Sequence, residues 1–537
     1  MPTRIEFDKQ EELRTQHQVR LDALMTASER NRSGQFATPP SLALEIARYS
    51  VTLCAQGRRS IRFFEPALGS GAFYSALRRC VPAKAIESAR GIELNEALAS
   101  TAKELWESSG LEVINADFTR MTPSASDRAN LIITNPPYVR HHHLDQGDKA
   151  RLRGIASTII QRNVSGLSGL YCYFLILADR WLSQNGIGVW LIPSEFMDVN
   201  YGEAVKEYLS RHVSLIRLHR FDPQEVQFDD ALVSSAVVVY RKALPAEDHT
   251  VECSFGGSLL EPRHQRVVSP KVLSNTRKWT TLLDASGNGS ACGDAAPSFE
   301  PTLSSLFSVT RGIATGANDF FILERNEAAS LCIANRFLKP ILPSPRYVKD
   351  AIIDADEDGY PVVERQLALI DSDLPEALLR KACPPLWEYL EAGEARGIRN
   401  AYLIAKRTPW YRQEQREPAP FLCTYMGRSE KHLRPFRFIW NRSRAIAPNV
   451  YLLLYPKGPL KRAVEEEPDL MNQVFEFLES IEPDALITEG RVYGGGLYKL
   501  EPKELLRISA KRLIERLNLD LGSEHTQRRF EFAATGP

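Results

Sequence analysis

Short apolar runs alternate with longer amphipathic segments through the first 245 residues. The runs are rich in β-branched and aromatic residues and end at polar or glycine-containing turns, which predicts buried strands. The intervening segments, such as 42–51, repeat apolar residues at helical spacing. This alternation predicts an α/β domain with a doubly wound, seven-stranded sheet, its last two strands forming an antiparallel edge pair. Strands are expected near 61–64, 89–93, 113–117, 127–134, 187–193, 215–219 and 235–240.

Residues with chemical potential stand where the first four predicted strands end, which is where open α/β sheets bind ligands. The first strand leads into Glu65-Pro66-Ala67-Leu68-Gly69-Ser70-Gly71, whose glycines let the backbone approach a ligand closely. Glu93 follows Gly71 by 22 positions, the spacing at which nucleoside-binding folds accept hydrogen bonds from ribose hydroxyls. Asp117, followed by Phe118, could accept a bond from an adenine amino group.

The fourth strand ends in Asn135-Pro136-Pro137-Tyr138. A rigid diproline turn would fix the Asn135 carboxamide oxygen and a neighbouring carbonyl as two acceptors, which suits an exocyclic NH2 group. Tyr138 offers a flat face on which a planar base could stack. The alternative is a strand-ending turn whose asparagine caps its own backbone.

The segment 33–40 contains Thr38-Pro39-Pro40 just before a helical pattern. Thr38 is predicted to be a helix N-cap, with proline at the first helical position. The free N–H groups and positive dipole end there would bind an anionic carboxylate. The alternative is a capped surface helix with no ligand.

In this order along the chain, the motifs resemble those of the gamma-arrangement adenine-N6 DNA methyltransferases of bacterial type II restriction-modification systems. In that family the cofactor motifs precede the catalytic motif, which precedes a target-recognition domain. The resemblance implies a class I S-adenosylmethionine-dependent methyltransferase fold, Rossmann-like and seven-stranded, with a C-terminal α+β target-recognition domain. The sequence departs from the family in Leu68, where a small residue or cysteine is usual.

The resemblance also implies roles for individual residues. The catalytic group would be Asn135, Pro136, Pro137, Tyr138 and Phe228, and the S-adenosylmethionine-binding group Thr38, Glu65, Pro66, Ala67, Gly69, Gly71, Glu93, Asp117 and Phe118. Phe228 would hold a flipped-out adenine against Tyr138, although it could equally be a core residue. Methyl transfer to adenine N6 needs no covalent nucleophile, and the chain has no Pro-Cys pair of the cytosine-C5 type.

The second half follows a glycine- and serine-rich stretch at 284–297 that indicates a linker. Segments 307–321 and 493–506 resemble the beginning and end of target-recognition domains. The predicted organisation is a helical arm at 1–32, a catalytic domain at 33–245, a connecting segment at 246–300 and a DNA-recognition domain at 301–537.

Residues 406–444 combine many arginines with aromatic residues. Arginines contact phosphates and guanine edges, whereas the aromatic rings would stack on bases or pack the platform. A solvated basic face is the alternative. The expected DNA-binding residues are Arg412, Arg428, Lys431, Arg434, Arg437 and Arg442, and the interleaved aromatics are Trp410, Tyr411, Phe421, Tyr425, Phe436, Phe438 and Trp440.

Overall charge changes this picture little. The 67 basic residues balance 67 acidic ones, and a net charge of zero is compatible with local basic patches. No stretch of about 18 apolar residues and no signal-peptide pattern is present, which predicts a cytoplasmic protein without a membrane partner. Dispersed cysteines argue against disulfides and zinc. The adjacent histidines His141, His142 and His143 cannot all face one ion, so no metal is expected.

The expected partner is double-stranded DNA, with the chain acting as a monomer beside a separate restriction endonuclease or alone. No Pro-Asp…Glu-x-Lys arrangement suggests a fused nuclease. Four alternatives remain open: a protein glutamine-N5 methyltransferase, an RNA methyltransferase, a cytosine-N4 methyltransferase, and a DNA-binding specificity subunit with a vestigial catalytic half.

Overall fold

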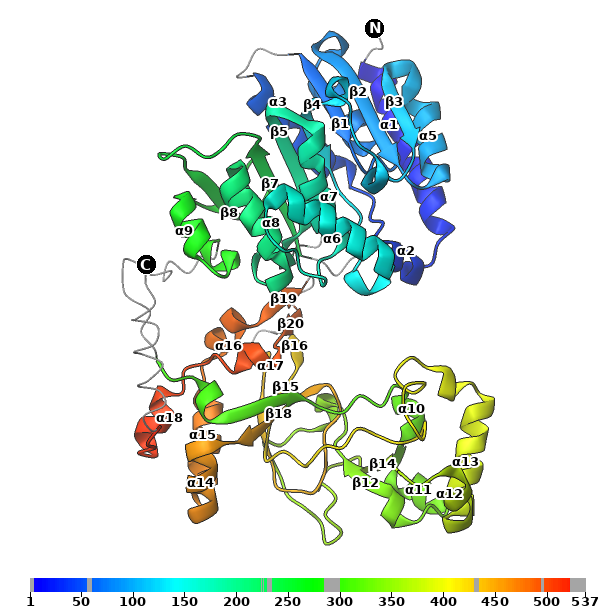
Figure 1. The fold of residues 1–537 in the computed structure, drawn as a ribbon, viewed down its shortest axis with the longest axis vertical. Coiled ribbons are helices and arrows are strands. Elements are labelled where there is room, and N and C mark those ends of the chain that lie inside the picture. The colour runs from blue at the N-terminus through cyan, green and yellow to red at the C-terminus, as the bar shows by residue number, and fades with distance from the viewer. Residues whose placement is uncertain are drawn as a thin grey trace. The chain divides into compact units, whose positions relative to one another are not determined.

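The computed structural model describes residues 4–55, 60–223, 225, 227–228, 234–283, 300–428, 434–493 and 497–521. Two compact units can be distinguished (Figure 1). The first comprises Met1–Asp294 and Tyr493–Gly496, and the second comprises Ala295–Val492 and Leu497–Pro537. Among the described residues, no helix has the length and apolar character needed to cross a membrane.

The first unit is built on a nine-stranded sheet with the order β3-β2-β1-β4-β5-β7-β6-β8-β9 (Figure 1). Neighbouring strands from β3 to β5 pair in parallel, whereas β7 is antiparallel to both β5 and β6. The strands are β1 (Ile61–Glu65), β2 (Ile86–Glu93), β3 (Leu111–Asn115), β4 (Ala129–Thr134), β5 (Leu182–Pro193), β6 (Ser214–Arg220), β7 (Ser235–Arg241), β8 (Val251–Gly257) and β9 (Pro262–Val268).

All seven predicted strands are present, but the prediction that the last two form the edge of the sheet is wrong. β7 lies between β5 and β6, and β8 and β9 extend the sheet beyond β6. β9 escaped prediction because most of its side chains are polar and exposed, so that it lacks the alternation of a half-buried strand.

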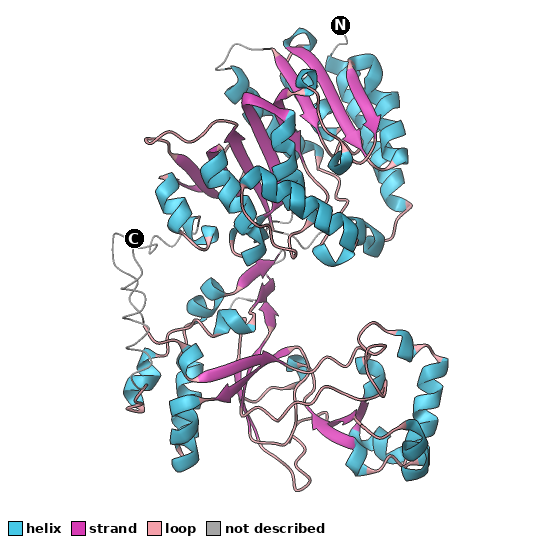
Figure 2. Cartoon of the chain, viewed as in Figure 1, coloured by secondary structure: helices cyan, strands magenta, loops and turns pink. Residues whose placement is uncertain are grey.

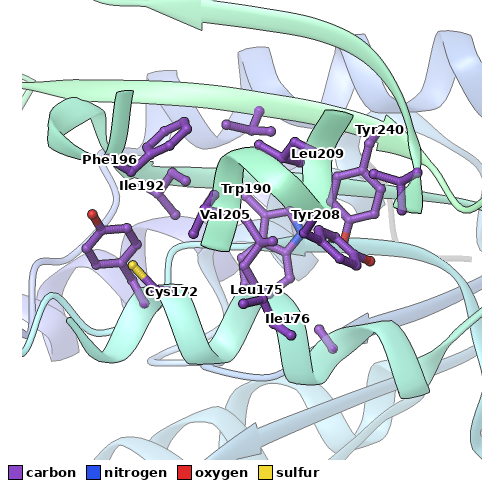
Figure 3. Packing of buried hydrophobic residues seen from close by; sticks show 14 of the residues in the cluster. Cys172, Leu175, Ile176, Trp190, Ile192, Phe196, Val205, Tyr208, Leu209 and Tyr240 are labelled. Carbon is purple, nitrogen blue, oxygen red and sulfur yellow. Dashed lines mark hydrogen bonds between the residues drawn. The ribbon is translucent and has the colours of Figure 1, made fainter. Parts of the chain in front are cut away.

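Successive strand residues face opposite helical layers, as the two-residue period of a strand requires. Phe63 packs with helices α3 (Pro40–Ala55), α4 (Ala72–Cys80) and α5 (Glu96–Trp106). Its neighbour Phe64 packs with α6 (Gln146–Ile160), α7 (Leu170–Leu177) and α8 (Glu203–Glu207). Figure 3 shows part of the second layer, including Cys172, Leu175 and Ile176 of α7 and Trp190 and Ile192 of β5. The sheet is therefore covered on both faces, as predicted for a doubly wound fold.

The N-terminal helix α1 (Arg4–Ala23) docks on α4 and α5, and a short helix α2 (Ala27–Ser33) follows it. The Gln10 amide donates a 2.5 Å bond to the Leu105 carbonyl, and Asp8 pairs with Arg79 at 3.3 Å. α1 is therefore packed against the first unit along this face.

The second unit combines small sheets with peripheral helices, an α+β arrangement (Figure 2). Its five-stranded sheet has the order β10 (Phe307–Arg311), β18 (Tyr451–Pro456), β15 (Phe421–Thr424), β17 (Phe438–Asn441) and β13 (Ile352–Ile353). A three-stranded sheet comprises β11 (Ile322–Glu324), β14 (Leu367–Ile370) and β12 (Leu338–Ile341). A further sheet comprises β16 (Met426–Arg428), β20 (Leu497–Lys499) and β19 (Arg491–Tyr493).

The helices of this unit lie around the sheets. They are α10 (Asn318–Phe321), α11 (Arg325–Ser330), α12 (Glu376–Ala382), α13 (Pro384–Ala395), α14 (Gly458–Glu466), α15 (Leu470–Ser480), α16 (Pro483–Glu489), α17 (Pro502–Leu505) and α18 (Lys511–Arg516). The preceding helix, α9 (Pro270–Asn275), belongs to the first unit.

Packing, rather than base stacking, accounts for the aromatic residues of segment 406–444. All seven of their side chains are buried: Trp410, Tyr411, Phe421, Tyr425, Phe436, Phe438 and Trp440.

Candidate active site

A cavity of about 640 Å³ lies at the carboxyl ends of β1 to β4 in the first unit. Ten of the residues predicted for the site line it: Thr38, Glu65, Pro66, Ala67, Gly69, Glu93, Asp117, Phe118, Asn135 and Pro137. Four others do not: Gly71, Pro136, Tyr138 and Phe228. The remaining wall comes mainly from α1, α2, α6 and α7, from segment 34–37 and from the loops that follow the strands. Residues as far apart in sequence as Arg14 and Phe174 thus converge on one cavity.

The two predicted glycines of the loop after β1 have different tasks. Gly69 has a φ of +55°, and a Cβ atom there would meet nothing within 4 Å, so the backbone borders open space. Gly71 has a φ of +86°, and a Cβ atom there would lie 2.6 Å from Nε1 of Trp106. That indole donates a 2.9 Å bond to the Ser70 carbonyl. Gly69 therefore borders the cavity, whereas Gly71 lets α5 pack against the loop.

Glu93 and Asp117 carry internal hydrogen bonds at the cavity wall. The Glu93 carboxylate accepts from the backbone N–H groups of Gly69 and Asn95, each at 2.8 Å. Burial raises the pKa of Glu93, and these bonds partly oppose that rise. Asp117 accepts 2.8 and 2.7 Å bonds from the backbone and hydroxyl of Thr119, and its other oxygen lies 3.2 Å from Arg120. Each carboxylate keeps lone pairs for a further donor.

Glu65, at the end of β1, is only 2% exposed, and its Oε2 has no hydrogen-bond partner among the described residues. Burial raises the pKa of the Glu65 carboxyl well above its usual value. The neighbouring Glu93 carboxylate adds to this rise, whereas the Arg14 guanidinium opposes it. A buried carboxylate without a donor is costly, so a cationic ligand in the cavity would be stabilised by it.

The Asn135 side chain is held by its amino group. Its Nδ2 donates a 3.0 Å bond to the Phe36 carbonyl and a 3.2 Å bond to the Thr38 hydroxyl. Oδ1 is buried and has no hydrogen-bond partner among the described residues. The carboxamide is therefore fixed in orientation and presents an unused acceptor, because its donors are already satisfied.

The prediction of Thr38 as a helix N-cap is wrong. Helix α3 begins at Pro40, and its first intrahelical bond runs from the Ala43 N–H to the Pro39 carbonyl. Pro39 thus holds the position before the helix, and Thr38 lies outside it. The Thr38 hydroxyl accepts a bond from Asn135 instead, which serves the orientation of that side chain.

Tyr138 belongs to an aromatic cluster beside the cavity. Its ring lies 5.6 Å from that of Phe36, tilted by 42°, and 6.2 Å from that of Phe228, perpendicular to it at 90°. The Phe36 and Phe228 rings are 6.1 Å apart. The Tyr138 hydroxyl donates a 3.2 Å bond to the Leu191 carbonyl. We call Phe36, Tyr138 and Phe228 the aromatic trio; its rings are not a parallel pair.

Sequence reasoning missed two residues that shape this region, Gly34 and Phe36. The Tyr138 N–H donates a 2.9 Å bond to the Gly34 carbonyl, and a Cβ atom on Gly34 would lie 2.5 Å from that same nitrogen. Gly34 also has a φ of +65°. The segment 33–38 thus lies across the Asn-Pro-Pro-Tyr turn. The sequence does show a glycine and an aromatic residue shortly before Thr38, but no local pattern around them indicates a role in the site.

The three adjacent histidines form a short 3-10 turn after the Asn-Pro-Pro-Tyr motif. Burial lowers the pKa values of His141 and His142, and neighbouring cations lower them further. His143 lines the cavity. Across the described part of the chain, no group of three His, Cys, Asp or Glu side chains could hold a metal ion.

The predicted DNA-binding residues of the second unit differ in their surroundings. Arg437 donates bonds of 2.9 and 2.8 Å to the Pro345 and Val348 carbonyls, and Arg434 donates one of 2.7 Å to the Glu479 carbonyl. Arg442 lies 3.4 Å from Asp354 and 4.0 Å from the centre of the Trp440 ring. Arg412 and Arg428 have exposed side chains. Lys431 lies outside the described residues.

Two family models match the chain. Residues 40–227 match the Eco57I restriction-modification methylase, and residues 276–525 match the C-terminal domain of the type II methyltransferase M.Eco57I. Among curated proteins, the type II methyltransferase M.AccI of Acinetobacter calcoaceticus is 26% identical over 89% of this chain and 85% of its own. M.XamI of Xanthomonas campestris pv. amaranthicola is 27% identical over the same shares.

Solved structures resemble the fold. The type IIL restriction-modification enzyme MmeI in complex with DNA has a TM-score of 0.53 at 13% identity, covering 91% of this chain and 69% of its own. The DrdV–DNA complex has a TM-score of 0.53 at 12% identity, covering 90% and 56%. The predicted class I methyltransferase fold with a C-terminal α+β unit is confirmed. By its two matched domains and its relatives along most of the chain, the protein belongs to the type II restriction-modification methyltransferases.

Proposed function

We propose that this protein transfers a methyl group from S-adenosylmethionine to N6 of an adenine that is flipped out of double-stranded DNA. The observation that carries the proposal is the Asn135 carboxamide, whose Nδ2 is held by Phe36 and Thr38 and whose buried Oδ1 has no partner among the described residues. An unused acceptor fixed beside a cavity suits an amino group brought in by a substrate.

Asn135 and Pro136 would act on the adenine amino group, whose lone pair is delocalised into the ring and therefore weakly nucleophilic. Oδ1 accepts one N–H and the Pro136 carbonyl accepts the other, and no described residue bonds to that carbonyl. Both acceptors favour a pyramidal nitrogen and stabilise the positive charge that develops on it. The carbon–sulfur bond of the cofactor's methyl group would break as the C–N bond forms, and N6 would then release one proton to water.

The cavity fits S-adenosylmethionine in its volume and in its polar groups. Glu65 supplies a buried carboxylate for the ammonium group, and Glu93 accepts from the ribose hydroxyls. Asp117 accepts from the adenine amino group, and Phe118 together with the 72% exposed Leu94 offers apolar surface to the ring. Gly69 allows close approach of its backbone. When bound, the cofactor supplies an electrophilic methyl group on its sulfonium.

The aromatic trio would receive the flipped base. A base stacked on Tyr138 meets Phe228 edge-on, because the two rings are perpendicular. This arrangement replaces the sandwich that the sequence suggested. A base within the duplex stack cannot reach the cofactor, so extrusion is required.

The second unit would bind the DNA. Arg412 and Arg428 are the strongest candidates for phosphate or base contacts, because their side chains are exposed. Arg437, bonded to three backbone carbonyls, would instead hold the surface in shape. The protection of host DNA from a cognate endonuclease is the biological role that fits such an activity.

The test is single-molecule sequencing of DNA from a methylation-deficient host that expresses the full chain. We expect N6-methyladenine in one short sequence motif. The Asn135→Ala variant should leave the DNA unmodified, whereas Asn163→Ala, at an exposed position of the same unit, should modify it fully.

Other outcomes would each contradict a part of the proposal. N4-methylcytosine in place of N6-methyladenine would refute the base assignment. Unmodified DNA from a soluble protein that binds S-adenosylmethionine would refute DNA as the substrate and favour protein or RNA. Failure of the purified protein to bind S-adenosylmethionine would favour a specificity subunit.

A further inference from the structure

Arg14 lies on α1, ahead of residues 40–227 that match the methylase family. Its side chain is nevertheless buried, at 2% exposure, and borders the cavity. Gln18 borders the same cavity one helical turn later. α1 therefore contributes to the wall of a cavity that is also lined by the strand ends of the sheet and by α2, α6 and α7.

The Arg14 guanidinium is held rigidly on one side. Its Nε and Nη2 donate to the two carboxylate oxygens of Glu11 at 2.9 and 2.6 Å, a bidentate arrangement. Glu11 also accepts a 2.5 Å bond from the Ser75 hydroxyl of α4. A helix of the catalytic unit thus fixes the carboxylate that fixes the arginine.

The other side of the guanidinium meets the glycine-containing loop. Nη1 donates a 2.9 Å bond to the Ser70 hydroxyl. A guanidinium carries five N–H groups, two of them on Nη1, so one Nη1 donor remains after the bond to Ser70. A buried cation with a spare donor is a binding group for an anion, and Arg14 offers this beside the cavity.

The cavity thus has a buried cation and a buried anion on separate elements, Arg14 on α1 and Glu65 at the end of β1. These two side chains are electrostatically coupled, since Arg14 opposes the rise of the Glu65 pKa. An amino-acid zwitterion, with an ammonium and a carboxylate on one carbon, complements such a pair.

We propose that Arg14 binds the α-carboxylate at the amino-acid end of S-adenosylmethionine, which makes the N-terminal helix part of the cofactor site. This inference rests on the cofactor assignment made above. The beginning of α3, which the sequence suggested for a carboxylate, is less suited: the cavity wall includes Thr38 but none of residues 39–42. Of the described arginines that line the cavity, Arg14 is buried, whereas Arg32 is exposed and Arg151 is half-buried.

The experiment compares two ligands on each variant by calorimetry. S-adenosylhomocysteine has the amino-acid end, whereas 5′-methylthioadenosine lacks it. Arg14→Met should weaken S-adenosylhomocysteine about 10- to 100-fold and change methylthioadenosine affinity less than about 2-fold, because only the first ligand carries a carboxylate. Arg20→Met, at an exposed position of α1, should leave both affinities unchanged.

Four results would overturn the inference or its basis. An equal loss for both ligands would show that Arg14 only supports the loop, and an unchanged affinity for both would show that it has no role. Arg14→Lys keeps the charge and should recover part of the affinity for S-adenosylhomocysteine alone; recovery for both ligands would contradict the inference. If the unmodified protein binds neither ligand, the cofactor assignment itself fails.

Discussion

The cavity of about 640 Å³ contains the polar side chains of Glu65, Glu93 and Asp117, whereas the aromatic trio packs ring against ring at 5.6 to 6.2 Å and shares one member, Phe36, with the cavity wall. The cavity side contains buried polar atoms that have no hydrogen-bond partner in the described part of the chain, such as Glu65 Oε2. Two of the trio are buried, Tyr138 at 7% and Phe228 at 4% exposure, Phe36 is partly buried, and the Tyr138 hydroxyl donates to the Leu191 carbonyl.

This difference indicates how the two ligands are admitted. The cofactor side is preformed, because strand ends of one sheet fix its groups whether or not a ligand is bound. The base side is held by contacts between distant segments, with Phe36, Tyr138 and Phe228 filling one another's space. On the proposed function, a flipped base would have to displace part of that packing, which would couple DNA binding to a local rearrangement.

Asn135→Ala should separate the two sides most strongly. The variant removes the acceptor that stabilises positive charge on N6, so we expect turnover to fall about 1,000-fold or more. Cofactor affinity should stay within about 2-fold, because the proposed function assigns the Asn135 Oδ1 to the adenine amino group and no cofactor group to this side chain. Single-turnover methylation and cofactor titration measure the two quantities. A parallel loss of cofactor binding would show that the two sides form one structural unit.

Glu65→Gln should act on the cavity side alone. We expect cofactor affinity to fall about 10- to 100-fold, since the buried carboxylate is the partner of the ammonium group. The variant should also unfold at a higher temperature at pH 8, because a carboxyl whose folded-state pKa is raised costs stability as the pH rises from its ordinary pKa to the raised one, and the full cost persists above that. The gain should shrink toward pH 4, where the carboxyl is protonated in both states.

The same carboxyl makes a pH dependence in the unmodified protein. As the pH falls through the raised pKa of Glu65, the carboxyl gains a proton and loses its attraction for the ammonium group. Affinity for S-adenosylhomocysteine should therefore weaken toward low pH, and in Glu65→Gln this dependence should be flatter. An equally steep dependence in the variant would assign the titration to another group.

Sequence reasoning predicted the residues on the cavity side far more completely than those on the base side, and the reason is physical. Gly69, Glu93 and Asn135 each follow an apolar run, so the strand pattern alone brings them to one edge of the sheet. Phe36 and Arg14 follow no strand, and their positions depend on how segment 33–38 and α1 pack, which no local pattern encodes.

The buried aromatic residues of the second unit also show that local sequence does not determine how side chains pack. Phe421, Phe438 and Trp440 are interleaved with arginines, a composition that favours nucleic-acid binding, but they lie on strands β15 and β17 and face a core. Composition named the residue types correctly, but every residue of β15 and β17 is buried, so these rings pack in the interior and do not face solvent.

Phe228→Leu should give the smallest of the expected effects, and it tests the aromatic trio most directly. The substitution keeps apolar volume but removes the ring edge that a base on Tyr138 would meet, so we expect turnover to fall roughly 3- to 10-fold, matching about 0.5–1.5 kcal/mol for an aromatic pair. Cofactor affinity should not change, because Phe228 does not border the cavity.

Methylation of a duplex whose target adenine faces an abasic site distinguishes two origins of this loss of turnover. If Phe228 holds the extruded base, the deficit persists when extrusion is easier; a deficit that disappears there would place Phe228 in the opening step. A gain in turnover on the normal duplex would show that the trio acts as a barrier to the base, and would reverse the role assigned to this ring.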